Sequence, residues 1–239
     1  MSNNKYIIFG EKYADELEEP IKKAGFIPFF LPDNPDVDKR LSGHADLSVF
    51  FDGEKRIYAA PFLKNSNAVF RLEGLGYSVI FPDIVQNPVY PQDAPLNIRL
   101  FGGRCIYSEK VSCREIAAAL SARGTSMISV RQGYCACSVC ALDDNAVITA
   151  DPGIHSAAKA RGIDSLLIRA GHIALEGFDY GFIGGAAFRI SERVIAFTGR
   201  LDLHPDKEEI LAFLKKYRIS PAFLTDKPIF DIGSAIPLP

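Results

Sequence analysis

A stretch near the start of the chain sets a pattern that recurs along it: residues 46–59 read DLSVFFDGEKRIYA. Two apolar runs, 46–51 and 56–59, flank the turn signal Asp52-Gly53, which is typical of a β-hairpin. Residues 65–75 have helical potential, and the apolar run 77–81 predicts a third strand. The stretch therefore opens a β-β-α-β unit, and a repeat of such units would determine the whole fold.

Three further units follow the same plan. The second starts at Asn97, turns at Gly102-Gly103 and ends in an expected strand over 127–130. The third covers 138–168, and the fourth covers 182–217. Only half of a fifth unit remains at the C-terminus, where we expect a strand over 229–232. An expected strand, helix and strand within residues 5–30 supply its missing half.

Five units spaced by about 45 residues, the last completed by both ends of the chain, predict an α/β ring. We expect a five-bladed β/α propeller that forms one domain over residues 1–239. Closing the ring removes the exposed sheet edges that an open array would leave. The alternative is an open doubly wound sheet, which strands alternating with helices usually indicate. We favour the ring because pairs of strands, rather than single strands, separate the helices.

Composition excludes several classes of function. The net charge of −2 provides no basic footprint for nucleic acid, and no apolar run approaches the ~20 residues of a membrane span. The apolar run 6–9 is too short for a signal-peptide core. Five cysteines, an odd number, favour a reduced, cytoplasmic location. We therefore expect neither a nucleic-acid nor a membrane partner. The oligomeric state stays open, a homo-oligomer included.

Two short motifs place acidic groups beside strand-like runs. In Gly43-His44-Ala45-Asp46 the histidine and the aspartate are two residues apart, so on a strand both side chains would leave the same face. In the stretch 176–185, EGFDYGFIGG, Glu176 and Asp179 converge only if Gly177 permits a bulge. Plainer interpretations are a surface aspartate beside a core-edge histidine, an acidic loop that caps a strand, and glycines that allow close backbone packing.

A third cluster consists of Cys135, Cys137 and Cys140. With a fourth ligand such as His155 it would suit zinc, but on a strand Cys140 would point away from the other two. Buried free cysteines are also common as small apolar side chains. The alternatives are core thiols, a thiol of Cys135 or Cys137 that faces a central pocket, and a metal site. We expect no metal and no cofactor.

The repeat and the two acidic motifs resemble the pentein fold. This is the five-bladed β/α propeller of guanidino-modifying enzymes, which a ribosome anti-association initiation factor shares, and the chain looks like a bacterial branch of it. Gly43-His44-Ala45-Asp46 is similar to the Gly-His-x-Asp/Glu motif of arginine and agmatine deiminases. The run 176–179 is similar to their Glu-Gly-Gly-Asp motif, with Phe178 in place of one glycine.

The chain departs from the family in two ways. The acidic motif follows the histidine motif, so the resemblance requires a circular permutation of the motif order. Asn97 stands where the family has its nucleophilic cysteine, and the segment 231–235 echoes the motif around that cysteine but lacks one. The nearest substitute is Cys137, which opens the next blade. In a ring of five blades, one blade corresponds to a fifth of a turn. We therefore expect the Cys137 thiol to lie several ångströms from the position of the family's cysteine.

The resemblance implies a hydrolase or transferase that acts on a guanidine or another small cationic nitrogen compound in a central acidic pocket. In it His44 would be the acid–base group, Asp46 would hold the guanidinium and Cys137 would be the nucleophile. The expected substrate-binding side chains are those of Asp93, Asn97, Glu176, Asp179 and Asp231. The alternatives are a non-catalytic binder of small molecules and an interaction protein on the same fold.

Overall fold

The computed structural model describes residues 5–239 and contains five separate three-stranded sheets. In each sheet a central strand pairs antiparallel with one neighbour and parallel with the other. A parallel pair needs a crossover connection, and a helix provides it in every sheet. The β-β-α-β repeat predicted from the sequence is confirmed, and the single open sheet is ruled out.

Four sheets form from continuous stretches of chain. Their elements, in order, are β3 (Val49–Phe51), β4 (Arg56–Ala59), α3 (Asn67–Gly74) and β5 (Ser78–Ile80); β6 (Arg99–Phe101), β7 (Arg104–Tyr107), α4 (Arg114–Ala122) and β8 (Ser126–Ser129); β9 (Val139–Asp143), β10 (Ala146–Thr149), α6 (Pro152–Ala160) and β11 (Asp164–Leu167); β12 (Ala187–Ser191), β13 (Val194–Phe197), α7 (Lys207–Lys216) and β14 (Ser220–Phe223).

The fifth sheet joins the two ends of the chain. Strand β1 (Tyr6–Gly10) runs parallel to β2 (Ile27–Leu31) across helix α1 (Ala14–Lys23), and antiparallel to β15 (Ile236–Leu238). Closure by the termini is thus confirmed, but the expected strand over 229–232 is wrong. That segment has one isolated bridge, between Phe230 and Ala174, and β15 begins four residues after it. The intervening turn carries Asp231 towards the centre of the molecule.

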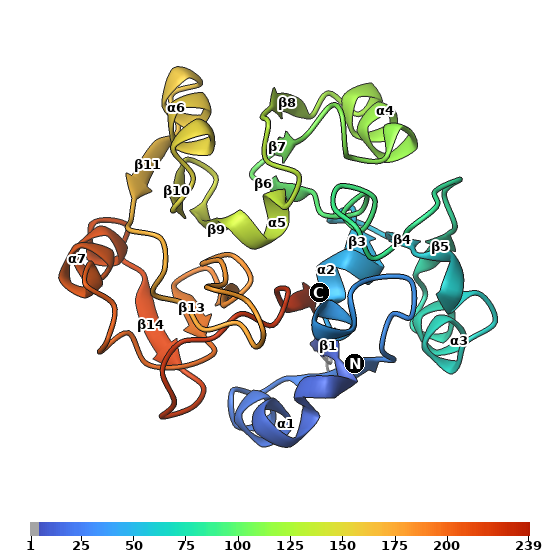
Figure 1. Cartoon of the computed structure of the whole chain (residues 1–239), viewed down its shortest axis with the longest axis horizontal. Coiled ribbons are helices and arrows are strands. Elements are labelled where there is room, and N and C mark those ends of the chain that lie inside the picture. Colours follow the sequence, from blue (N-terminus) through green and yellow to red (C-terminus); the bar gives the residue numbers. More distant parts are fainter. Residues whose placement is uncertain (1–4) are drawn as a thin grey trace.

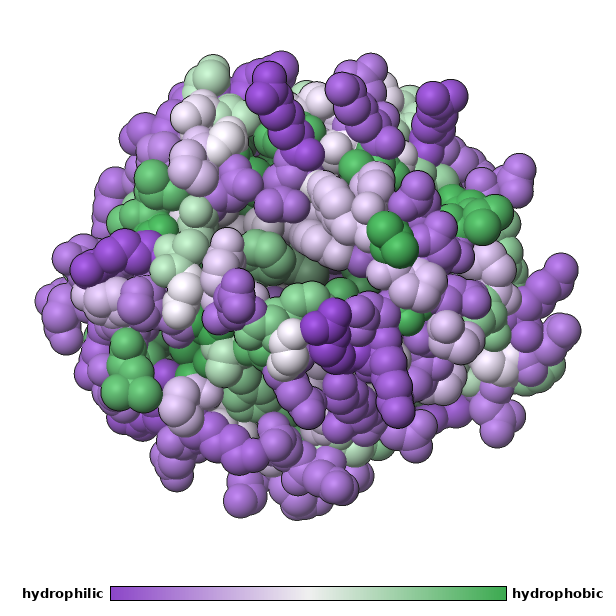
Figure 2. Space-filling view, in the orientation of Figure 1, coloured by the Kyte–Doolittle hydropathy of each residue, from purple (hydrophilic) through white to green (hydrophobic). Residues whose placement is uncertain are grey.

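The five sheets surround a common centre, and α1, α3, α4, α6 and α7 lie on the outside (Figure 1). Each helix buries an apolar stripe against its own sheet; in α7 this stripe is formed by Ile210 and Leu214. The ring is therefore held by apolar layers between neighbouring blades, leaving the centre to polar groups. In the same orientation, apolar and weakly polar side chains gather around a hollow near the middle of the face, and hydrophilic ones form the rim (Figure 2). Within residues 5–239, no helix has both the length and the apolar character needed to cross a membrane.

Candidate functional site

Two four-residue helices, not strands, bring the histidine motif and the cysteine cluster to the centre (Figure 1). Helix α2 (Ala45–Ser48) follows His44, and α5 (Cys135–Ser138) follows Tyr134, each directly before the first strand of its blade. The expectation that His44 and Asp46 share a strand face, and likewise Cys135 and Cys137, is therefore wrong. The chain turns sharply before each strand, so the motif residues at α2 and α5 point inward rather than along a sheet face.

Cys137, Asp46 and Asn97 meet directly. The Cys137 thiol donates to Asp46 Oδ2 at 3.0 Å and accepts a hydrogen bond from Asn97 Nδ2 at 3.2 Å. Asn97 Oδ1 in turn accepts from the backbone of Ala136 at 2.7 Å and of Cys137 at 3.3 Å, which fixes the start of α5. The one-fifth turn between blades does not remove the thiol from the carboxylate, because α5 extends to the centre.

His44 completes this group. One ligand atom each from His44, Asp46 and Cys137 lie within 4.8 Å of one another. His44 is buried, and its Nε2 has no hydrogen-bond partner among residues 5–239. Asp46 Oδ1 is likewise buried and unpartnered there. Buried polar atoms are nearly always paired, so two orphans beside a thiol indicate a place for a polar ligand.

Asp231 approaches from the C-terminal turn. Its carboxylate accepts from the backbone nitrogens of Gly233 and Phe182, both at 2.8 Å. A Cβ on Gly185 would collide with this carboxylate, and one on Gly184 would collide with the backbone at Cys137. The interpretation of these glycines as close-packing residues is therefore correct, and the atoms that pack so closely belong to the polar centre.

Asp93 lies one step behind the group. Its Oδ2 accepts a short hydrogen bond from the hydroxyl of Tyr134, the residue that precedes α5. Gln86 donates to the backbone oxygen of Asp93 at 2.9 Å and to that of Leu47 at 2.8 Å, which ties this segment to α2. Asp93 therefore contacts a tyrosine of the cavity wall. Sequence reasoning missed Tyr134, although its position directly before the Cys-x-Cys motif was a signal.

The acidic motif 176–179 lies at the surface. Gly177 has a positive φ of 76°, which a bulged turn requires. The side chain of Glu176 is 86% exposed, and its carboxylate lies 3.8 Å from Lys12. Asp179 is exposed and lines a cavity together with His44 and Cys137, but Glu176 does not line that cavity. The two acids therefore do not converge as expected.

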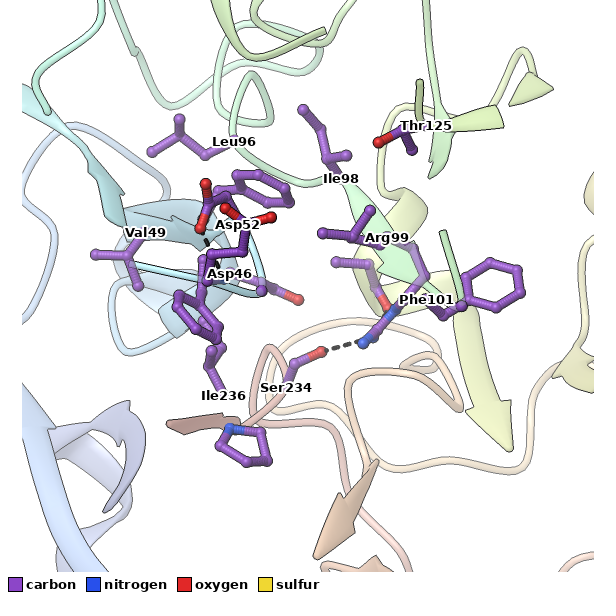
Figure 3. Close-up of a pocket in the computed structure, with 18 of the residues that line it drawn as sticks. Asp46, Val49, Asp52, Leu96, Ile98, Arg99, Phe101, Thr125, Ser234 and Ile236 are labelled. Atoms are coloured by element: carbon purple, nitrogen blue, oxygen red, sulfur yellow. Dashed lines mark hydrogen bonds between the residues drawn. The ribbon is translucent and has the colours of Figure 1, made fainter. Parts of the chain in front are cut away.

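We call this space the thiol cavity. It has a volume of about 250 Å³ and is lined by Leu41, His44, Tyr134, Cys137, Phe182, Asp231 and, from the loop before Phe182, Leu175, Phe178, Asp179 and Tyr180. A larger space of about 580 Å³, the arginine cavity, is lined by Asp46, Arg99, Ser234 and apolar side chains such as Leu96 and Ile98 (Figure 3). The two cavities share no lining residue. The buried contact between Asp46 and Cys137 lies between them.

Arg99 forms the wall on that second side. Its guanidinium donates to the backbone oxygens of Ala136 and, at 3.4 Å, of Gly184, and to Ser234 Oγ at 3.2 Å (Figure 3). It therefore connects three other blades at the centre. Its positive charge also favours the ionised form of Asp46. The sequence signal was weak, because a single arginine at the start of a strand is ordinary.

Burial governs the protonation of the site. It raises the pKa of Asp46 to about 6, against the hydrogen bond from Cys137 and the charge of Arg99. It raises the pKa of Asp231 to about 7, with a further contribution from the charge of Asp46. Burial lowers the pKa of His44 to about 3 and, together with the two aspartates, raises that of the Cys137 thiol well above its usual value. Near neutral pH the histidine and the thiol are both uncharged.

The side chains of His44, Asp46 and Cys137 could also hold a metal ion, since His, Asp and Cys are all zinc ligands. The cysteine cluster considered from the sequence does not form such a site in residues 5–239. Cys135 donates to the backbone oxygen of Gln132 at 3.0 Å, and His155 pairs with Ser165 at 3.0 Å. The helix α5 separates these cysteines instead of gathering them.

Comparison with solved structures identifies the architecture. Agmatine deiminase from C. jejuni is 11% identical, with a TM-score of 0.54 over 92% of this chain and 87% of that one. DDAH from Pseudomonas aeruginosa in complex with citrulline is 14% identical, with a TM-score of 0.53 over 98% of this chain and 99% of that one. Inosamine-phosphate amidinotransferase from Streptomyces griseus is 12% identical, with a TM-score of 0.58 over 95% of this chain and 79% of that one. A search of curated proteins gave no match.

These structures share the pentein fold, so the chain has that fold: a five-bladed β/α propeller with polar residues gathered at the centre. At such low identities the likeness defines the fold alone. Within that fold, residues 8–236 match the family of unknown function DUF6873, and the chain belongs to this family.

Proposed function

We propose that the chain is a hydrolase or transferase that acts on a guanidine in the thiol cavity, with Cys137 as nucleophile, His44 as acid–base group and Asp46 as guanidinium ligand. The observation that carries the proposal is a buried thiol within reach of a buried imidazole and a carboxylate, the last two with unpartnered atoms. The solved relatives, a deiminase, DDAH and an amidinotransferase, support the same class of chemistry.

Binding follows from the charges. A guanidinium is a planar cation whose paired N–H groups match a carboxylate. Asp231 is the carboxylate in the buried part of the thiol cavity. Asp46 lies behind the Cys137 thiol, and its Oδ1, which has no partner among residues 5–239, would accept from a guanidinium that reaches past the sulfur. The positive charge of the ligand offsets the burial that raises both pKa values, so binding is coupled to ionisation of these two groups. Asp93, Asn97 and Asp179 serve in support: Asn97 orients the thiol, Asp93 holds Tyr134, and Asp179 adds negative charge at the rim.

The chemistry then needs one proton shuttle. The sulfur of Cys137 attacks the central guanidinium carbon while its proton passes to Nε2 of His44, which has no other partner among residues 5–239. Because burial lowers the pKa of His44 and raises that of the thiol, this transfer is the demanding step. The carbon–nitrogen bond breaks as His44 returns that proton to the departing amine. A thiouronium remains on Cys137. Water, or a second amine in a transferase, attacks the same carbon and releases the thiol.

The test is turnover with a trapped intermediate. The protein is incubated with a set of alkylguanidines and amino-acid guanidines while released amine and ureido product are quantified and the intact protein is weighed by mass spectrometry. We expect amine release and a covalent adduct that Cys137→Ala abolishes and Cys113→Ala, a change in the outer helix layer, retains. Neither amine nor adduct with any guanidine would overturn the proposal.

A non-catalytic binder is the second candidate. The burial of the Cys137 thiol and its hydrogen bond to Asp46 favour it, because both raise the thiol pKa, whereas activated cysteines have a lowered one. In that case cations would raise the melting temperature through binding to the folded state but would form no adduct. The same mass-spectrometric experiment with a parallel melting curve separates the two functions.

A further inference from the structure

The wall of the thiol cavity differs in chemistry from its floor. His44, Cys137 and Asp231 are buried to at least 97%, so they form the floor, whereas Phe178 and Tyr180 are 37% and 40% exposed and stand at the mouth. Four aromatic side chains of the lining, which we call the aromatic wall, connect the floor to the mouth: Tyr134, Phe178, Tyr180 and Phe182. Phe182 lies 6.1 Å from Tyr180 and 6.1 Å from Tyr134, centroid to centroid.

The aromatic wall is held in place from outside. Arg40 lies over the ring of Phe178 at 4.1 Å and donates to the backbone oxygen of Gly177 at 2.6 Å. The same guanidinium is paired with Asp38 at 2.6 Å. The loop that carries Phe178 is thereby fixed to the segment before α2, so the rings form a preformed wall.

The described lining of the thiol cavity has no positively charged side chain that could pair with an anionic group of a ligand. Asp179 and Asp231 are its charged members, and no lysine or arginine belongs to its lining in the described chain. Three cations line a neighbouring space together with Glu176, and each is already engaged. Lys12 donates to the backbone oxygen of Arg40 at 3.0 Å, Arg40 is bound as above, and Lys227 is paired with Glu16. A carboxylate on a ligand would lose its hydration here and face aspartates.

We propose, building on the guanidine function above, that the preferred substrate is a small guanidinium with an uncharged aliphatic or aromatic tail, and not a free amino acid such as arginine. Aspartates and His44 take the guanidinium at the floor, and the rings contact the tail. The volume of about 250 Å³ suits a tail of a few carbons, since the pockets of drug-sized ligands measure roughly 300–1,000 Å³.

The test compares three probes by titration calorimetry in Cys137→Ser, which cannot form the adduct: guanidinium ion, butylguanidine and arginine. We expect butylguanidine to bind at least about 10-fold more tightly than either of the others. Tyr180→Leu should weaken butylguanidine by about 3- to 10-fold and leave guanidinium unchanged, because it removes a ring at the mouth only. Phe70→Leu, an exposed ring on α3 (60%), is the matched control and should change neither.

A second variant supplies the missing charge. Tyr180→Arg should raise the affinity for arginine relative to butylguanidine, since a carboxylate then has a partner. If arginine binds as tightly as butylguanidine before that change, the inference about the tail is overturned and the guanidine function stands. If no probe binds, both are overturned.

Discussion

The Cys137 thiol is held between side chains of two other blades. It donates to Asp46 and accepts from Asn97, and burial together with two carboxylates keeps it protonated. The charge needed to release the proton must then come from the ligand, because a bound cation offsets the carboxylates that hold the proton in place. In the proposed mechanism the thiol therefore stays protonated, and unreactive, while the cavity is empty.

This leads to a first prediction. Without ligand, alkylation of Cys137 by iodoacetamide should be slow at neutral pH and should still rise with pH beyond about 9, because thiolate is the reactive form and its ordinary pKa is about 8.5. Guanidinium ion should lower the apparent thiol pKa, followed by the ultraviolet absorbance of the thiolate. Cys137→Ala supplies the background of the other four cysteines. A rate that levels off below about pH 8 would contradict the account of the thiol.

A second prediction concerns Asp46 and Asp231. Their pKa values are raised to about 6 and about 7, so they become fully charged only above neutrality. Affinity for guanidinium should therefore increase with pH, by at least about 10-fold between pH 5 and pH 8, as measured by calorimetry. Asp231→Asn should weaken guanidinium binding at pH 8 and should remove the part of the rise in affinity that occurs near pH 7, where Asp231 ionises. An affinity that falls over this range would be the contrary result.

At the scale of single elements, the short helices and the glycines around them determine the site. The loop that precedes β12 lies so close to α5 and to the C-terminal turn that side chains cannot fit at Gly184 and Gly185. The backbone of Gly185 also binds both segments. Its N–H donates to the backbone oxygen of Cys137 at 2.9 Å, and its carbonyl oxygen accepts from the backbone N–H groups of Ile232 and Ser234 at 3.1 Å each. A change at this position should therefore disturb several blades together.

The third prediction follows. Gly185→Ala should lower the free energy of unfolding by about 1–3 kcal/mol, as overpacking does, and should abolish guanidinium binding, since the added Cβ meets the Asp231 carboxylate. Gly74→Ala is the control: it lies in α3 with nothing within 4 Å of its Cβ position. That change should be neutral or stabilising by roughly 0.5–1 kcal/mol. Urea denaturation measures both, and equal effects would contradict the close-packing argument.

At the scale of the whole molecule, the ring depends on the union of the two ends of the chain. Strand β15 covers an edge of β1, and Leu238 is buried to 99% in the core shared with Phe29 and Ile57. Without it, β1 would present unpaired backbone groups at the edge of a hydrophobic strand.

The fourth prediction tests this closure. Leu238→Ala should cost about 2–5 kcal/mol, as is usual for a buried leucine, although the residue is the second from the end. Leu203→Ala, with a side chain 75% exposed, should change stability by less than about 0.5 kcal/mol. Thermal and urea melting curves compare the two variants. A mild effect at Leu238 would mean that the blades hold together without the terminal strand.

The sequence by itself determined the repeat, the five sheets and the closure by both termini. These follow from local properties: alternating apolar runs, turn residues and helical periodicity repeat in each unit. It also indicated His44, Asp46 and Cys137 as residues with suitable chemistry. It placed the last strand wrongly. The stretch 229–232 has three apolar residues around Asp231 and resembles a strand, but its neighbours in space allow it only the isolated bridge between Phe230 and Ala174.

Only the tertiary structure decided how these residues meet. Four-residue helices at 45–48 and 135–138 are too short to show a period, so the inward turn of His44 and Cys137 could not be predicted. The aromatic wall joins Tyr134 with the loop at Phe178, and Arg99 connects four blades, through contacts between residues far apart in the chain. Burial, which depends on every blade at once, shifted the pKa values of the aspartates, the histidine and the thiol. Local pattern fixes the elements, whereas the chemistry at the centre comes from packing between elements distant in sequence.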